Sequence, residues 1–209
     1  MVYLTVDSQA PINQGDIFRD VPCVEMSLAS LSILDDDTPR VTSWRDILTE
    51  GNEPVTAILP LKPVTAIVVS QNCDNAHGRY ITLAQVVPFS QVLGGALPGT
   101  AKKWKSKITQ HAKTNYRFFY LPAAGSLAFS ERMSADFRLL FQVPRTDLEG
   151  MRDMRLGRLN EEAAQHFRET VAYFFRRYAY NEWYPLTKEE FEAYAADLDE
   201  PVKAYPWQE

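Results

Sequence analysis

The feature that most constrains the fold is a nearly continuous β-branched run, Val64–Ser70. A run of this length and composition is typical of a strand buried on both faces, so it predicts a central strand of a sheet. Polar residues follow it directly, and Tyr80–Val87 has the composition of a further strand. Together the two segments predict a β-hairpin joined by a polar loop.

Further strand signals lie on both sides of this hairpin. Gln14-Gly15-Asp16 is a turn signal ahead of a strand that begins at Ile17, and Pro22 favours an edge position or a bulge in that strand. An acidic loop is expected at 35–39. Other strands are predicted at 55–61, 118–121 and 137–143, and a short helix at 44–48.

The last third of the chain changes to helical spacing. Asn160 has the character of an N-cap, and apolar residues recur every three or four positions from Ala163 to Tyr178. Thr187-Lys188-Glu189-Glu190 is a capping box that opens a second helix. We therefore expect an α+β protein with a mostly antiparallel core in residues 1–145, a basic insertion at 101–117, and a helical extension in 146–209 that packs on the core.

Charge and cysteine content restrict the class of protein. The formal net charge is −5 and the pI is near 5.3, which argues against global, non-specific binding of nucleic acid. Cys23 and Cys73 are far apart in sequence, as expected for reduced thiols, so a cytoplasmic location is predicted. The N-terminus has no signal-peptide pattern and no apolar run is long enough for a membrane span. No membrane association and no cofactor are expected.

The polar loop after the central strand, residues 70–77, is the first candidate site. Cys73 could be a nucleophile activated by His77 and oriented by Asp74, or the same three side chains could belong to a metal site. In a third hypothesis the Asn and Asp side chains hold the turn and Cys73 is a buried thiol. The third is favoured, and no metal is expected, because the chain has only two other histidines.

A basic stretch at 101–117 is the second candidate site. It contains six cations and no acid, with aromatic rings among the cations, a mixture that suits single-stranded nucleic acid. A solvated loop anchored by its tryptophan explains it equally well. The candidate nucleic-acid-binding residues are Lys102, Lys103, Trp104, Lys105, Lys107, Lys113 and Arg117.

Three arginines at a spacing of three residues, Arg152, Arg155 and Arg158, form a further charged group. Acidic residues of similar number lie near them in the sequence. Ion pairs on the surface of helices account for this pattern, so a special anion site is the less favoured hypothesis.

The order of motifs in residues 12–90 resembles the MazF/PemK-type toxin barrel. Gln14-Gly15-Asp16-Ile17-Phe18 opens a strand, Lys62-Pro63 precedes the apolar run that ends at Ser70, and a later strand ends in Val87-Pro88. The family has an arginine before that proline, whereas this chain has Lys62, which keeps the charge but not the planar fork of a guanidinium. The Ser-Gln-x-Cys-Asp segment at residues 70–74 also resembles one in bacterial proteins with a similar helical end.

The toxin-barrel resemblance implies a fold and an activity. The fold would be a small SH3-like, mostly antiparallel β-barrel, usually present as a homodimer, on which the two C-terminal helices expected from the spacing would pack. The activity would be metal-independent cleavage of single-stranded RNA, with Lys62 and Arg79 neutralising phosphate and Ser70 and Asp74 polarising a ribose hydroxyl. The alternative hypothesis is a non-catalytic module that binds a protein partner.

Overall fold

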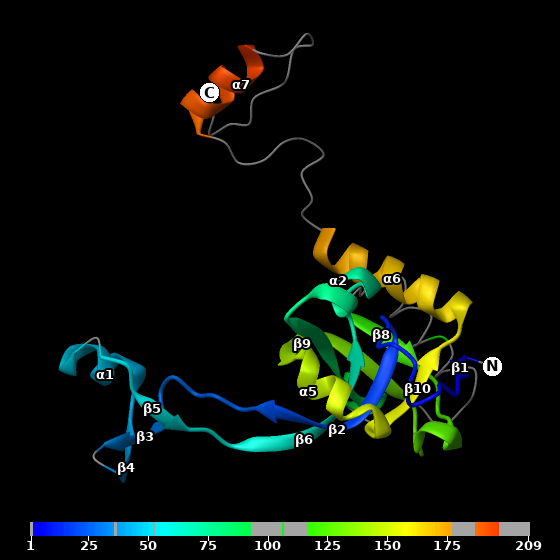
Figure 1. Cartoon of the computed structure of the whole chain (residues 1–209), viewed down its shortest axis with the longest axis horizontal. Helices are drawn as coiled ribbons and strands as arrows, with labels where there is room; N and C mark the ends of the chain where they lie inside the picture. Colours follow the sequence, from blue (N-terminus) through cyan, green and yellow to red (C-terminus); the bar gives the residue numbers. More distant parts are fainter. Residues whose placement is uncertain are drawn as a thin grey trace. The chain divides into compact units, whose positions relative to one another are not determined.

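The computed structural model describes residues 2–35, 37–51, 53–92, 106, 117–176 and 187–196. These residues form ten strands in two sheets, with all pairings antiparallel, and six α-helices (Figure 1). The predicted α+β class with mostly antiparallel sheets is therefore confirmed. The larger sheet has the order β1 (Tyr3–Leu4), β10 (Arg155–Leu159), β2 (Asp16–Val24), β6 (Leu61–Val68), β7 (Tyr80–Pro88), β9 (Met133–Pro144) and β8 (Phe118–Leu121). The smaller sheet has the order β4 (Thr38–Thr42), β3 (Leu31–Asp35) and β5 (Thr56–Ile58).

Strand β6 lies at the middle of the larger sheet, between β2 and β7, as the β-branched run predicted. Its residues alternate between two hydrophobic cores. Ile67 belongs to one core, whereas Ala66 and Val68 belong to the other, and all three are fully buried. Because both faces of β6 are covered, its sequence lacks the polar alternation of a half-exposed strand.

Helices cover the two faces of the larger sheet. On one face, Phe167 of α6 contacts the rings of Phe119 and Phe137 at centroid distances of 5.1 and 5.6 Å. On the other face, Leu148 of α5 is buried with the second core. The six helices are α1 (Trp44–Glu50), α2 (Asn72–His77), α3 (Phe89–Val92), α5 (Arg145–Gly150), α6 (Glu161–Arg176) and α7 (Lys188–Ala196).

The larger sheet curls, and its two edge strands are linked through a tyrosine. The hydroxyl of Tyr3 in β1 donates a 2.9 Å hydrogen bond to the carbonyl of Pro122, which directly follows β8. The Tyr3 ring also meets Phe129 edge-on at 6.1 Å. In the described residues β1 and β8 do not pair as strands, so the sheet is not a closed barrel.

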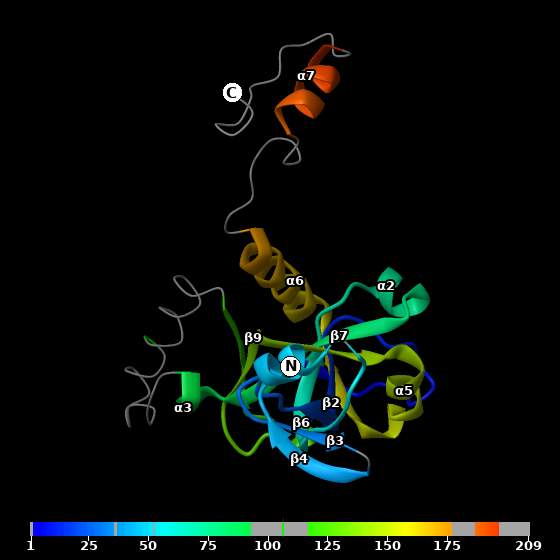
Figure 2. The same ribbon diagram turned by 90° about the vertical axis from the view of Figure 1, so that its left-hand side faces the viewer.

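A long arm, residues 21–64, projects from the larger sheet (Figure 1), and Figure 2 shows the same arm from its end. β10 pairs with β2 only as far as Phe18, and β7 pairs with β6 only from Ala66 onward. Val21–Val24 and Leu61–Val64 therefore pair only with each other, and we call this part the ribbon. Residues 25–60, which we call the tip, contain the smaller sheet and α1.

The chain divides into two compact units, Met1–Phe174 and Phe175–Glu209. The first contains both sheets, including β10, so the boundary expected at residue 145 falls ahead of a strand that belongs to the core. The second contains α7, a helix close to the one that the capping box predicted.

Candidate functional site

The loop after β6 is held by a network that joins two sequence motifs 55 residues apart. The Gln14 backbone N–H donates to Oδ1 of Asn72 at 2.8 Å, and the Gln14 side chain donates to the Val69 carbonyl at 2.6 Å. Ser70 Oγ donates to Oδ1 of the buried Asn75 at 2.6 Å. These contacts support the hypothesis that polar side chains hold this turn, because each satisfies a group at the end of a buried strand.

Cys73 and Asp74 lie on α2, a helix of six residues that follows this loop. Cys73 is exposed, so the expectation of a buried thiol at this position is wrong; the buried cysteine is Cys23. The sulfur of Cys73 is 3.8 Å from both Gln71 Oε1 and Asp74 Oδ1. Within the part of the chain that the structure describes, no hydrogen bond joins Cys73 to His77, and no three candidate ligands gather as a metal site.

Lys62 lies at the opposite end of β6 from this loop. It is the second residue of the strand, so about 26 Å of extended chain separate it from Ser70. Its ammonium group forms an ion pair with Glu25, and this hydrogen bond raises the pKa of Lys62. The toxin-barrel resemblance implies that Lys62 acts on the same substrate as Ser70 and Asp74, but β6 places Lys62 far along the strand from Ser70.

Arg79 lies next to α2, between that helix and β7. Its guanidinium group lies 5.3 Å from the centroid of the Tyr80 ring, and its carbonyl accepts from the Arg145 N–H at 2.9 Å. Of the five candidate catalytic residues, the structure therefore brings Ser70, Cys73, Asp74 and Arg79 to one end of the β6–β7 hairpin.

Most of the basic stretch lies outside the described residues, including Lys102, Lys103, Trp104, Lys105, Lys107 and Lys113. Arg117 is described and is exposed just before β8. Its carbonyl accepts from the Phe137 N–H at 2.9 Å, which fixes the backbone at the start of the strand.

Two of the three arginines, Arg155 and Arg158, lie on a strand and not on a helix, which corrects the sequence-based interpretation for them. Arg152 lies on a short 3-10 helix, Arg152–Met154, and forms an ion pair with Glu149 at 3.6 Å. Arg155 and Arg158 lie on β10 and both donate to the carboxylate of Asp16, which is completely buried. Arg155 also donates to the carbonyls of Asp7 and Ala10, at 2.6 and 2.9 Å. Arg155 therefore fixes the N-terminal loop to the sheet, a structural role that sequence spacing did not reveal.

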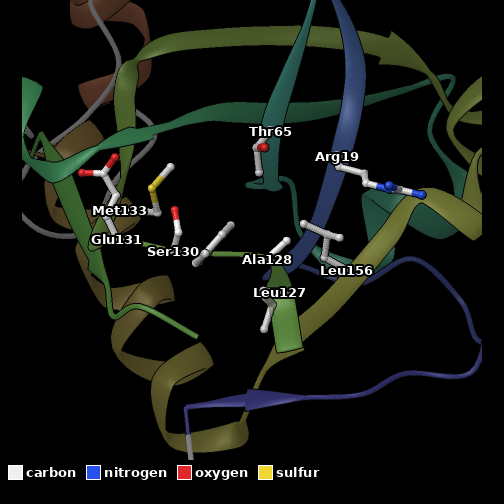
Figure 3. A pocket seen from close by; sticks show the side chains of 9 residues that line it. Arg19, Thr65, Leu127, Ala128, Ser130, Glu131, Met133 and Leu156 are labelled. Carbon is white, nitrogen blue, oxygen red and sulfur yellow. The ribbon is translucent and has the colours of Figure 1, made fainter. Parts of the chain in front are cut away.

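A pocket of about 200 Å³ lies between the β2–β6 pair, β10 and the 125–131 segment (Figure 3). Most of its lining is apolar, and Thr65 and Ser130 supply hydroxyl groups. The Arg19 guanidinium points away from the other labelled side chains and lies 3.8 Å from Asp20. Glu131 also lines the pocket. The volume is below that of a typical small-molecule site.

The arm has the largest concentration of exposed apolar side chains. Nine of the fourteen large apolar side chains exposed among the described residues belong to it, whereas the core of the tip consists of Leu31, Ile33 and Ile47 with Leu59 packed against them. The nine are Val24, Met26, Leu28, Val41, Trp44, Leu48, Val55, Ile58 and Leu61.

Strand register places some of these side chains in rows. Val41 and Ile58 both pair with Ser32, so they lie on one face of the smaller sheet. Leu31 and Ile33 point to the opposite face, where Ile47 of α1 packs on them. The face with Val41 and Ile58, which we call the uncovered face, therefore lies opposite α1.

No known protein family model matches the chain, and no curated protein matches it. Among the described helices, none has the length and apolar character needed to cross a membrane.

Proposed function

We propose that this chain is a protein-binding module in which the larger sheet supports the arm and the arm docks on a second protein. The observation that carries the proposal is that the arm exposes nine large apolar side chains, whereas the core of its tip contains only three buried ones among the described residues. Monomeric proteins rarely expose large apolar patches unless these bind something.

The ribbon supports docking through a face rather than an edge. Val24 pairs with Leu61 and Pro22 pairs with Pro63, so these four apolar residues lie on the same face. A proline has no backbone N–H, so the ribbon lacks a donor on each strand at this pair. Addition of a further strand at the edge is therefore disfavoured, and the apolar face is left as the contact surface.

The MazF/PemK-type resemblance remains a proposal about fold. The curl that brings Tyr3 to the carbonyl of Pro122 supports an SH3-like relationship. On that view the tip is an insertion between the Gln14-Gly15-Asp16 strand and the strand that begins near Lys62. Binding or cleavage of single-stranded RNA stays a prediction, and the separation of Lys62 from Asp74 gives it less support than the arm gives to protein binding.

Site-specific photo-cross-linking in the cells that produce the protein tests the proposal. A photoreactive residue is placed at Leu61 in the ribbon, and at Leu4 in β1 as the control, because both are leucines with about half or more of their surface exposed, 65% and 48%. We expect a protein adduct of one defined mass from position 61 and none from position 4.

Two results would contradict the proposal. The first is the absence of a protein adduct at position 61, or equal adducts at both positions. The second is binding of a single-stranded oligonucleotide that weakens steeply with salt and is lost when Lys102, Lys103, Lys105 and Lys107 are neutralised, because that result would favour nucleic acid.

A further inference from the structure

The net negative charge of the chain is concentrated in the tip. Residues 25–60 contain seven acidic side chains and two basic ones, Arg40 and Arg45, so their formal charge is −5. The whole chain also has a formal charge of −5, so acidic and basic residues balance outside the tip. The segment with the most exposed apolar side chains is therefore also the acidic segment.

Several of the acidic groups are neutralised within the arm. Lys62 forms an ion pair with Glu25, and Arg40 lies 3.2 Å from Asp35 and 2.6 Å from Glu50. Other acidic side chains are not neutralised in this way. Asp37 and Glu53 are exposed, and neither has an ion-pair partner among the described residues.

Strand order places these two acidic residues at the same end of the smaller sheet. Asp37 lies in the turn between β3 and β4. Glu53 comes shortly before β5, whose first residue, Thr56, pairs with Leu34 next to that turn. The uncovered face, with Val41 and Ile58, therefore has uncompensated carboxylates at one end.

We propose, on the premise that the arm is a protein-docking element, that its partner is a protein segment whose apolar side chains are flanked by lysine or arginine. Apolar groups of the partner pack on the uncovered face and its cations lie near Asp37 and Glu53. A second copy of the chain fits poorly, because two tips of charge −5 repel each other. Anionic lipid and nucleic acid are disfavoured for the same reason.

Two synthetic amphipathic peptides test this inference on the full-length protein by fluorescence anisotropy. They share the same leucine positions, but one has lysine and the other glutamate at the polar positions. We expect the lysine peptide to bind at least tenfold more tightly in 50 mM salt, and its advantage to shrink in 300 mM salt because of screening. A Val41→Ser/Ile58→Ser variant should weaken binding of the lysine peptide.

Charge variants locate the contact. Asp37→Asn/Glu53→Gln should weaken binding of the lysine peptide threefold or more, and asparagine tolerates the left-handed backbone of Asp37, whose φ is 63°. Glu131→Gln/Asp153→Asn removes the same charge from exposed positions outside the arm and should change binding little. Equal binding of the two peptides, binding of neither, or equal effects of the two charge variants overturns the inference. In each of these cases the proposed function still stands if photo-cross-linking at position 61 captures a different protein. It does not stand if the captured protein is a second copy of the chain.

Discussion

The carboxylate of Asp16 and the guanidinium of Arg155 form an ion pair at 2.9 Å in which both side chains are almost completely inaccessible to solvent. Asp16 begins β2 and Arg155 begins β10, 139 residues later, so the pair joins the first and last parts of the larger sheet. Arg158 donates to the same carboxylate. Two guanidinium groups are thus neutralised in part by one buried anion.

Neutralising Asp16 should destabilise the fold strongly. Asp16→Asn leaves the buried Arg155 without a full counter-charge, and removal of one partner from a buried pair costs about 3–5 kcal/mol of unfolding free energy. Urea denaturation followed by circular dichroism measures this loss. Asp20→Asn is the matched control, because Asp20 is exposed in the same strand and should leave the unfolding midpoint almost unchanged. Equal stability of the two variants would show that the buried pair is not important.

Tyr3 should make the protein sensitive to alkaline pH. Burial, with a smaller contribution from Tyr120, raises the pKa of Tyr3 well above its usual value of 10. The unfolded chain therefore releases this proton first, so the contribution of Tyr3 to stability is complete below about pH 10 and declines as the pH rises above it. Tyr3→Phe removes the hydrogen bond to Pro122 and should lower the free energy of unfolding by about 1 kcal/mol at pH 7. Between pH 8 and pH 11, however, the stability of this variant should decline less than that of the parent. Tyr80→Phe, at an exposed tyrosine, should keep the pH dependence of the parent.

The two cysteines should differ in reactivity toward a thiol reagent. Cys73 is exposed on α2, whereas Cys23 is buried in β2, where its sulfur accepts a hydrogen bond from Gln85 at 3.1 Å. We expect one thiol per chain to react rapidly with a disulfide reagent in the native protein and the second to react only on unfolding. Cys73→Ser should remove the rapid phase and Cys23→Ser should not. Rapid reaction of both thiols in the native state would contradict the burial of Cys23.

Strong local patterns predicted much of the fold. The β-branched run gave β6, and the period of the apolar residues after Asn160 gave α6, because in both segments local composition agrees with tertiary burial. Strands β4 and β10 were not predicted, because their local composition does not favour a strand. Thr38–Thr42 contains a proline and an arginine, and Arg155–Leu159 contains two arginines and a glycine, so neither has strand composition.

Contacts between residues distant in sequence determine features of the structure that local composition does not predict. Arg155 is buried only because Asp16, distant in sequence, supplies a charge, and spacing within one segment does not reveal such a partner. The same limit applies to the candidate site. Residues 70–77 were recognised from their position after a buried strand, but their link to Gln14 and their distance from Lys62 depend on topology. The exposed apolar surface of the arm likewise follows from how few elements cover it.

Ser70 should prove to be a structural residue. Its hydroxyl donates to Asn75 and accepts from the Thr82 N–H at 3.0 Å, so Ser70→Ala leaves partly buried polar groups unsatisfied. The expected loss is about 1–3 kcal/mol of unfolding free energy, measured by denaturant titration. Ser130→Ala, at an exposed serine, should have little effect. If Ser70 instead polarises a ribose hydroxyl, Ser70→Ala would abolish RNA cleavage at unchanged stability.

Ile47 should control the stability of the tip alone. Among the described residues of the tip, it is the one helical member of a core otherwise formed by Leu31, Ile33 and the partly buried Leu59, so Ile47→Ala removes a large share of that core. A cost of about 2–4 kcal/mol should exceed what so small a core can sustain, and the tip should open locally while the larger sheet stays folded. Hydrogen exchange followed by mass spectrometry should then show loss of protection in α1 and β3 but not in β7 and β9. Leu48→Ala, at the exposed neighbouring position, should leave protection in the tip intact, because Leu48 is 49% exposed and is not part of this core. Loss of protection in β7 and β9 along with the tip would mean that the arm and the larger sheet unfold together. In that case a substitution in the arm could not be made without also destabilising the larger sheet.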